Sequence, residues 1–176
     1  MNFFFPLIYS SILFTILILI CFYLIGQIKM TQNVEKHLSI LENRLQIDKK
    51  SSNDNYKLGQ LYLQKKIYTR AITLFRNSLQ YWDKNDKIGL GSLYNTLGFT
   101  YFKLKQYEPA EYYYIQAINL LPDYTLALTN LGLVYENRQM YKDAFKAYSG
   151  VLKYESKNKI TLSRISSIKS KLDLEF

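Results

Sequence analysis

Cysteine, histidine, proline and glycine are all scarce in this chain of 176 residues. The single cysteine, Cys21, cannot form an internal disulfide, and alone it cannot provide a cysteine-based metal site. Lysine, asparagine, isoleucine, tyrosine and phenylalanine are abundant instead. That bias is typical of AT-rich genomes, and organelle genomes are one common source.

Residue patterns that support catalysis are also absent. The sequence has no Walker A loop and no GxGxxG, HExxH or GxSxG motif. One histidine, His37, and one cysteine in an apolar segment cannot supply a Cys–His pair or a Ser–His–Asp triad. The carboxylates are scattered and usually near basic residues, as Asp143 is near Lys146, which is typical of solvated helix faces. We therefore expect no enzyme activity, catalytic residue, metal site, cofactor or small-molecule substrate.

Charge is missing from the first 26 residues, although the whole chain has a formal net charge of +9. The 23 Lys and Arg residues alternate with 14 Asp and Glu residues and match no nucleic-acid-binding signature. We therefore expect no nucleic-acid partner.

The uncharged region contains an apolar run of 23 residues from Phe3 to Ile25. A helix of that length spans about 34 Å, enough for a bilayer core of about 30 Å. Pro6 lies near its start, where a missing N–H costs little. A cleaved signal peptide is the alternative, but it needs a basic N-terminal region, a shorter apolar core and an A-x-A-like site. We predict an uncleaved transmembrane anchor in residues 1–26, in contact with lipid through residues 3–25.

The segment 27–51 is predicted to be a helical neck and hinge. Val34, Leu38, Leu41 and Leu45 recur at helical spacing along one face. A neck that packs against the following domain and a dimeric coiled coil both remain open, although fewer than two heptads is little for a coiled coil. The polar stretch from Asp48 to Asn55 is expected to be the hinge. No basic residue precedes the apolar run, and five follow it closely: Lys29, Lys36, Arg44, Lys49 and Lys50. By the positive-inside rule, this asymmetry predicts that the C-terminal domain lies on the cytoplasmic or stromal side.

A motif repeats three times in the rest of the chain. Its fullest copy comprises Leu97, Gly98, Tyr101, Ala110, Tyr114, Ala117 and Pro122. The next copy comprises Leu131, Gly132, Tyr135, Ala144 and Tyr148, and the preceding copy comprises Leu58, Gly59, Tyr62, Ala71 and Phe75. Gly132 follows Gly98 by 34 residues, which is the period of the tetratricopeptide repeat, a helix–turn–helix unit that stacks on copies of itself.

The predicted fold is therefore all-α, with a transmembrane helix followed by a tetratricopeptide solenoid and a C-terminal capping helix. The repeats are predicted at residues 52–85, 86–124 and 125–158, and the capping helix and tail at 159–176. Five extra residues around Trp82 are expected to form a loop in which Asn85 or Asp86 caps a longer first helix of the second repeat. The face of the capping helix that packs on the stack is predicted to carry Ile160, Ile165, Ile168 and Leu172.

The resemblance to tetratricopeptide solenoids implies a partner-binding groove lined by the first helix of each repeat. The positions that correspond to it here are Tyr56, Gln60, Leu63, Asn95, Phe99, Phe102, Leu126, Thr129 and Leu133. The carboxylate clamp of chaperone-binding relatives is absent, so an apolar helix or an extended segment is the expected ligand. An alternative is that the C-terminal helix covers part of this groove.

A basic rim is also predicted at the turns within the repeats, where a membrane surface or an acidic partner would meet it. It comprises Lys65, Lys66, Lys103, Lys105 and Arg138.

The architecture as a whole resembles the hypothetical chloroplast reading frame 37 family, small tetratricopeptide proteins of algal plastids and cyanobacteria. That resemblance implies association with the thylakoid and a role in the assembly or stability of photosystem I, with photosystem I subunits as partners. It implies a single-pass protein whose C-terminal domain faces the stroma, or the cytoplasm in a cyanobacterium. The alternative function is a membrane-anchored receptor or assembly factor of another kind, for protein import or an envelope complex.

Overall fold

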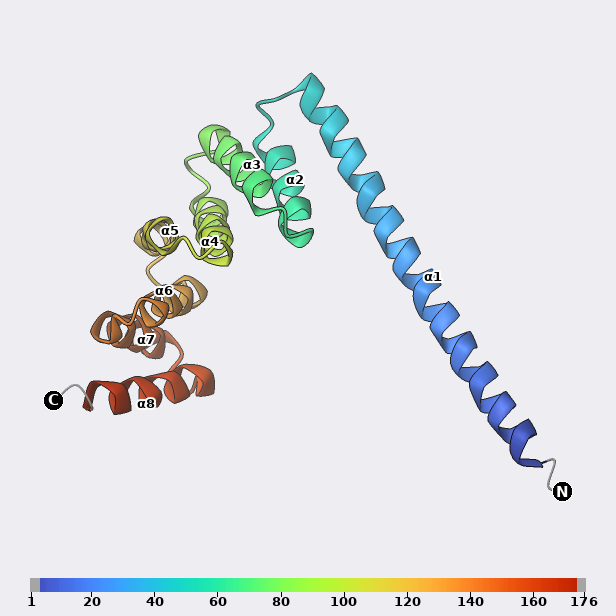
Figure 1. The fold of residues 1–176 in the computed structure, drawn as a ribbon. Coiled ribbons are helices and arrows are strands. Elements are labelled where there is room, and N and C mark those ends of the chain that lie inside the picture. The colour runs from blue at the N-terminus through green and yellow to red at the C-terminus, as the bar shows by residue number, and fades with distance from the viewer. Residues whose placement is uncertain (1–3, 174–176) are drawn as a thin grey trace. The chain divides into compact units, whose positions relative to one another are not determined.

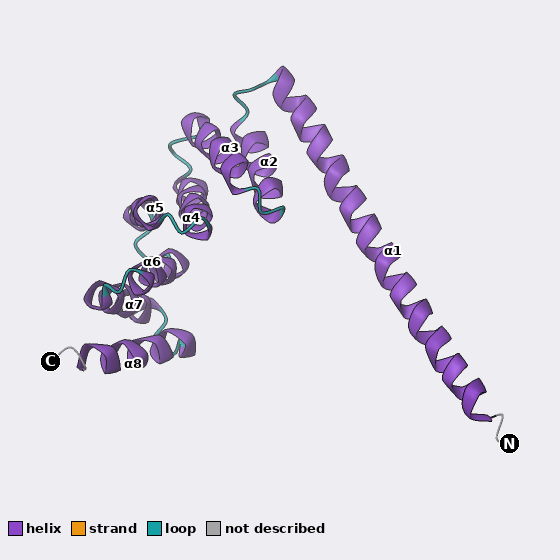
Figure 2. Cartoon of the chain, viewed as in Figure 1, coloured by secondary structure: helices purple, strands orange, loops and turns teal. Residues whose placement is uncertain are grey.

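The computed structural model describes residues 4–173, and all the regular structure in that range is helical (Figures 1 and 2). The chain divides into two units, residues 1–43 and 44–176, which are described separately. The predicted all-α class, with a long apolar helix followed by a helical-repeat solenoid, is confirmed.

Helix α1 runs without interruption from Phe4 to Ile47. At about 1.5 Å per residue, its 44 residues extend for about 66 Å. Among the described residues it is the one helix that is long and apolar enough to cross a membrane. The predicted anchor and neck are therefore parts of one helix, with no break at Gly26, and Phe3 lies outside the described residues.

In the described part of the second unit there are seven further helices, of which the first six pair in chain order. Their bounds are α2 Ser52–Gln64, α3 Tyr68–Tyr81, α4 Lys87–Lys103, α5 Tyr107–Leu120, α6 Thr125–Asn137, α7 Tyr141–Tyr154 and α8 Lys159–Asp173. The most extensive contacts join α2 to α3, α4 to α5 and α6 to α7, while α8 packs against α7 (Figure 1). We call the surface formed by α2, α4, α6 and α8 the first-helix face, and the surface formed by α3, α5 and α7 the second-helix face.

Side-chain caps set the starts of α2, α4 and α8, the last through Asn158, which accepts a hydrogen bond from the Thr161 N–H at 3.0 Å. Asp86 accepts a hydrogen bond from the Gly89 N–H at 2.8 Å, so of the two predicted candidates it is the N-cap of the longer α4. Ser51 caps α2 by accepting from the Asp54 N–H at 3.3 Å. The predicted hinge was therefore too long, because residues 52–55 form the first turn of α2.

Within each repeat a glycine of the first helix lies under an aromatic ring of the second. A Cβ atom added to Gly59 would come within 2.6 Å of the Phe75 ring, and one added to Gly132 would come within 2.5 Å of the Tyr148 ring. Gly98 meets Tyr114 in the same way, at 2.8 Å. Phe75, Tyr114 and Tyr148 are almost completely buried, so only glycine allows the two helices to approach this closely.

The turn between the helices of each repeat has the same backbone geometry. Lys66, Lys105 and Gln139 have φ values of 61°, 59° and 60°, in the left-handed region that favours glycine. In the first repeat the Lys66 N–H bonds to the Leu63 carbonyl and the Ile67 N–H to the Tyr62 carbonyl, and the other two repeats share this pattern. These are the bonds of a Schellman motif, which ends the first helix and reverses the chain.

Helix α8 covers the end of the stack. Ile165 and Ile168 are buried in a cluster with Ala144 and Tyr148, and Leu172 packs against this cluster. Ile160 was wrongly assigned to the same face, because its side chain is 69% exposed. The spacing explains the error: five residues separate Ile160 from Ile165, which places the two on different sides of a helix.

Replacing Gly132 with alanine should destabilise the repeats by about 2 kcal/mol, because the new methyl group overlaps a buried ring that cannot move away. The matched control is Gly150→Ala in α7, where an added Cβ makes an ordinary contact of 3.4 Å with Leu128. Alanine has the higher helix propensity by about 1 kcal/mol, so the control should be neutral or stabilising. Urea unfolding of the full chain in detergent, followed by circular dichroism, measures both; equal effects would contradict the packing argument.

Candidate functional site

The predicted groove residues lie on the first-helix face, but their exposure differs. Gln60 is exposed and Leu126 is 52% exposed. The half-buried members are Tyr56, Leu63, Phe99, Phe102, Thr129 and Leu133. Asn95 is 8% exposed and so contributes little accessible surface.

Tyr56 forms the N-terminal part of this face with aromatic neighbours. Its ring lies 5.8 Å from the Phe75 ring and 5.5 Å from the Trp82 ring, which it meets edge to face. Trp82 is half-buried and donates its indole N–H to Asp86 at 3.1 Å. The aromatic contacts hold Tyr56 in place while part of its ring stays accessible.

Asn95 joins two first helices. Its Oδ1 atom accepts a hydrogen bond from Asn130 Nδ2 of α6 at 3.0 Å. The nearby Tyr124 phenol has a raised pKa, mainly because it is buried, although side-chain hydrogen bonds with Ser92 and Asn95 oppose the shift. Asn95 is therefore a structural link between the second and third repeats, because a buried amide needs a partner.

The two phenylalanines of α4 have different surroundings. Phe102 packs against the core cluster that contains Ala110 and Tyr114, and its ring lies 5.9 Å from Tyr107. Phe99 has the Lys103 ammonium 4.9 Å from its ring centroid, a cation–π distance. Phe99 therefore offers an apolar surface with a positive charge beside it.

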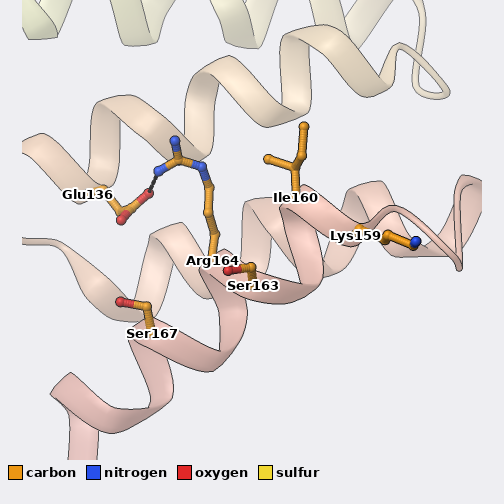
Figure 3. Close-up of a pocket in the computed structure, with 6 residues that line it drawn as sticks. All are labelled: Glu136, Lys159, Ile160, Ser163, Arg164 and Ser167. Atoms are coloured by element: carbon orange, nitrogen blue, oxygen red, sulfur yellow. Dashed lines mark hydrogen bonds and ion pairs between the residues drawn. The ribbon is translucent and has the colours of Figure 1, made fainter.

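The C-terminal end of the first-helix face is hollowed into a cavity of about 480 Å³ between α6 and α8 (Figure 3). Its lining residues are Glu136, Lys159, Ile160, Ser163, Arg164 and Ser167. Helix α8 therefore extends the first-helix face beside α6 and supplies two cationic side chains, two hydroxyls and an exposed isoleucine. These residues were not predicted as site residues, because α8 was interpreted as a cap or as a cover for part of the groove, not as a wall of a cavity; the irregular spacing of Ile160 was the available signal.

Glu136 organises this cavity. Its Oε2 atom accepts hydrogen bonds from Arg164 Nη1 at 2.8 Å and from the Tyr148 hydroxyl at 2.6 Å. The pKa of Tyr148 is raised by burial first and then by the bond to the Glu136 carboxylate. One carboxylate thus connects α6, α7 and α8.

A second carboxylate connects the preceding repeats. Glu111 of α5 accepts from the Tyr135 hydroxyl at 3.0 Å and pairs with Arg138, which also lies 3.6 Å from Glu108. Burial, together with Glu111, raises the pKa of Tyr135 to about 12. Arg138 was therefore wrongly placed on an open basic rim, because its charge is neutralised between two repeats. Lys65, Lys66, Lys103 and Lys105 are exposed at or near the turns, and their role as a rim stays a prediction.

Comparison with protein families matches residues 52–123 to the tetratricopeptide repeat. The ycf37 protein of Guillardia theta is 36% identical over 172 residues, which cover 98% of this chain and 97% of that protein. The chloroplastic tetratricopeptide repeat domain-containing protein PYG7 of Arabidopsis thaliana is 27% identical over 153 residues, covering 87% of this chain and 50% of that protein.

Solved structures share the fold. The crystal structure of YrrB, described as a tetratricopeptide protein with an unusual peptide-binding site, superposes with a TM-score of 0.70 at 20% identity. The match covers 84% of this chain and 74% of YrrB. At this identity the likeness shows the solenoid fold alone.

Replacing Glu136 with glutamine should lower the free energy of unfolding by about 1 kcal/mol, because the bonds from Arg164 and Tyr148 lose their charged acceptor. The control is Asp143→Asn in the more exposed Asp143–Lys146 pair, for which we expect almost no change. Urea midpoints of the full chain in detergent compare the two. An effect of Glu136→Gln no larger than that of the control would show that this carboxylate does not hold α8.

Proposed function

Because the chain belongs to the ycf37 family of tetratricopeptide-repeat proteins, we propose that it is a membrane-anchored scaffold that assists the assembly or stability of photosystem I. The observation that carries this proposal is the solvent-open first-helix face, which combines apolar side chains with amides, hydroxyls and cations. Photosystem I is the assembly that the family resemblance implies, and the similarity to a chloroplastic protein supports a plastid setting.

The first-helix face suits a protein segment better than a small molecule. Tyr56, Phe99 and Leu126 offer separate apolar contacts along consecutive repeats, and the α6–α8 cavity adds a polar end. Contacts spread over several repeats fit an extended or helical peptide. Binding of peptides by another tetratricopeptide protein of the same fold supports the same class of ligand.

The anchor confines this surface to a membrane. The apolar part of α1 is long enough to span a bilayer once, and every basic residue follows it. We propose a single-pass thylakoid protein whose repeats face the stroma, where newly made subunits are captured before they are assembled.

Deleting the gene should lower the amount of photosystem I relative to photosystem II, and the intact gene should restore it. The double variant Gln60→Glu/Leu126→Glu should not restore it, because an apolar ligand would then have to cover two charges that are otherwise exposed to solvent. Thr69→Glu/Asn119→Glu, with the same added charge at exposed positions of second helices, is the matched control. Photosystem levels are measured by immunoblot and by photo-oxidation of the reaction centre, with the level of the scaffold checked in each strain.

Normal accumulation of photosystem I in the deletion strain under all light regimes would count against the proposal. Accumulation of unprocessed precursor proteins in that strain would instead favour an import receptor.

A further inference from the structure

A second groove lies on the opposite surface of the repeats, between α3 and α5. It has a volume of about 510 Å³ and is lined by Ile72, Thr73, Arg76, Asn77, Leu79, Gln80 and Tyr113. All these residues belong to second helices, so the groove is separate from the first-helix face. The α3 residues recur at one-turn intervals, which places them along one side of that helix.

Tyr113 forms a rigid wall of this groove. Its ring is stacked on Tyr101 at 5.5 Å and on Tyr94 at 6.2 Å, and Tyr112 meets it edge to face at 5.2 Å. An aromatic ring held on several sides loses little freedom when a ligand packs on it, which suits an interface anchor. Ile72 and Leu79 are half-buried and add apolar surface along the other wall.

Arg76 is exposed, and among the described residues no carboxylate lies within ion-pair distance of it. The other arginines of the repeats are engaged: Arg138 and Arg164 pair with glutamates, and Arg70 donates to the Tyr62 hydroxyl at 2.9 Å. Helix α3 contains no acidic residue. Burial raises the pKa of the Tyr113 phenol and the Arg76 charge opposes that shift, which agrees with the two residues lining one groove.

Asn77 and Gln80 add two exposed amides on the same side of α3. Each amide both donates and accepts hydrogen bonds, as a peptide backbone does. A membrane surface would need a cluster of cations, whereas this groove has a single arginine beside apolar and amide groups. Its chemistry therefore favours a protein segment over an anionic lipid headgroup.

We propose that the α3–α5 groove is a second docking site, which binds an acidic protein segment with an aspartate or glutamate next to an apolar residue. The carboxylate pairs with Arg76, the apolar side chain packs on Tyr113 and Leu79, and the two amides bond to the backbone. The protein then holds two different segments at once, one on each face of the repeats.

Selection of random 12-residue peptides displayed on phage tests this, with the full chain in nanodiscs of zwitterionic phospholipid as the target. Peptides that are recovered with the wild-type chain but not with Arg76→Glu should be rich in Asp or Glu beside an apolar residue. As fluorescein-labelled synthetic peptides, they should bind Arg76→Glu at least tenfold more weakly by fluorescence anisotropy. Lys153→Glu on α7, an exposed site with the same change of charge, should bind them as the wild type does, and so should Lys159→Glu in the α6–α8 cavity.

The proposal would be overturned if the wild-type chain and Arg76→Glu select the same peptides. It would also be overturned if the peptides that only the wild type selects are not enriched in acidic residues. An equal loss of affinity with Lys153→Glu would also overturn it, because attraction to the overall charge would then explain the binding. If Arg76→Glu leaves peptide binding unchanged but weakens co-flotation with vesicles that contain phosphatidylglycerol, the groove binds anionic lipid and the proposal is wrong.

Discussion

Contact between one glycine and one aromatic ring sets the geometry of every repeat in this protein. Gly59, Gly98 and Gly132 let Phe75, Tyr114 and Tyr148 lie directly on the first helix, and the buried rings leave no room for a methyl group. This contact sets the distance between the two helices of a repeat. It also sets which side of the first helix faces away from the second helix. The two proposed binding surfaces therefore depend on three residues that carry no functional group of their own.

Carboxylates join the repeats to one another. Glu111 binds Tyr135 and Arg138 across the second and third repeats, and Glu136 binds Tyr148 and Arg164 across the third repeat and α8. These partly buried ion pairs and tyrosine hydrogen bonds tie the second repeat to the third and the third repeat to α8. The same pairs engage Arg138 and Arg164, which leaves Arg76 as the arginine whose charge faces solvent in a groove.

The repeats could be predicted from the sequence because close packing restricts residue identity at recurring positions. Asp86 could be predicted as a candidate N-cap because few side chains accept hydrogen bonds from the free N–H groups at the start of a helix. The groove was harder to predict, because exposure depends on neighbours from other repeats: Asn95 is covered through Asn130, and Arg138 is neutralised by Glu111. Ile160 was assigned to the packing face and Arg164 was missed, because a capping helix needs only one apolar face, while α8 also lines a cavity with its other side. The α3–α5 groove depends on the distance between two second helices, which no local pattern encodes.

The central claim is that the first-helix face receives photosystem I subunits. Placing a photo-crosslinking amino acid at Leu126, which is exposed on this face, and irradiating intact thylakoids tests it directly. The crosslinked segments, identified by mass spectrometry, should belong to subunits or assembly intermediates of photosystem I, and a crosslinker at the exposed Lys146 of α7 should not capture them. Capture of precursor proteins in transit from Leu126, or of the same proteins from both positions, would contradict the account.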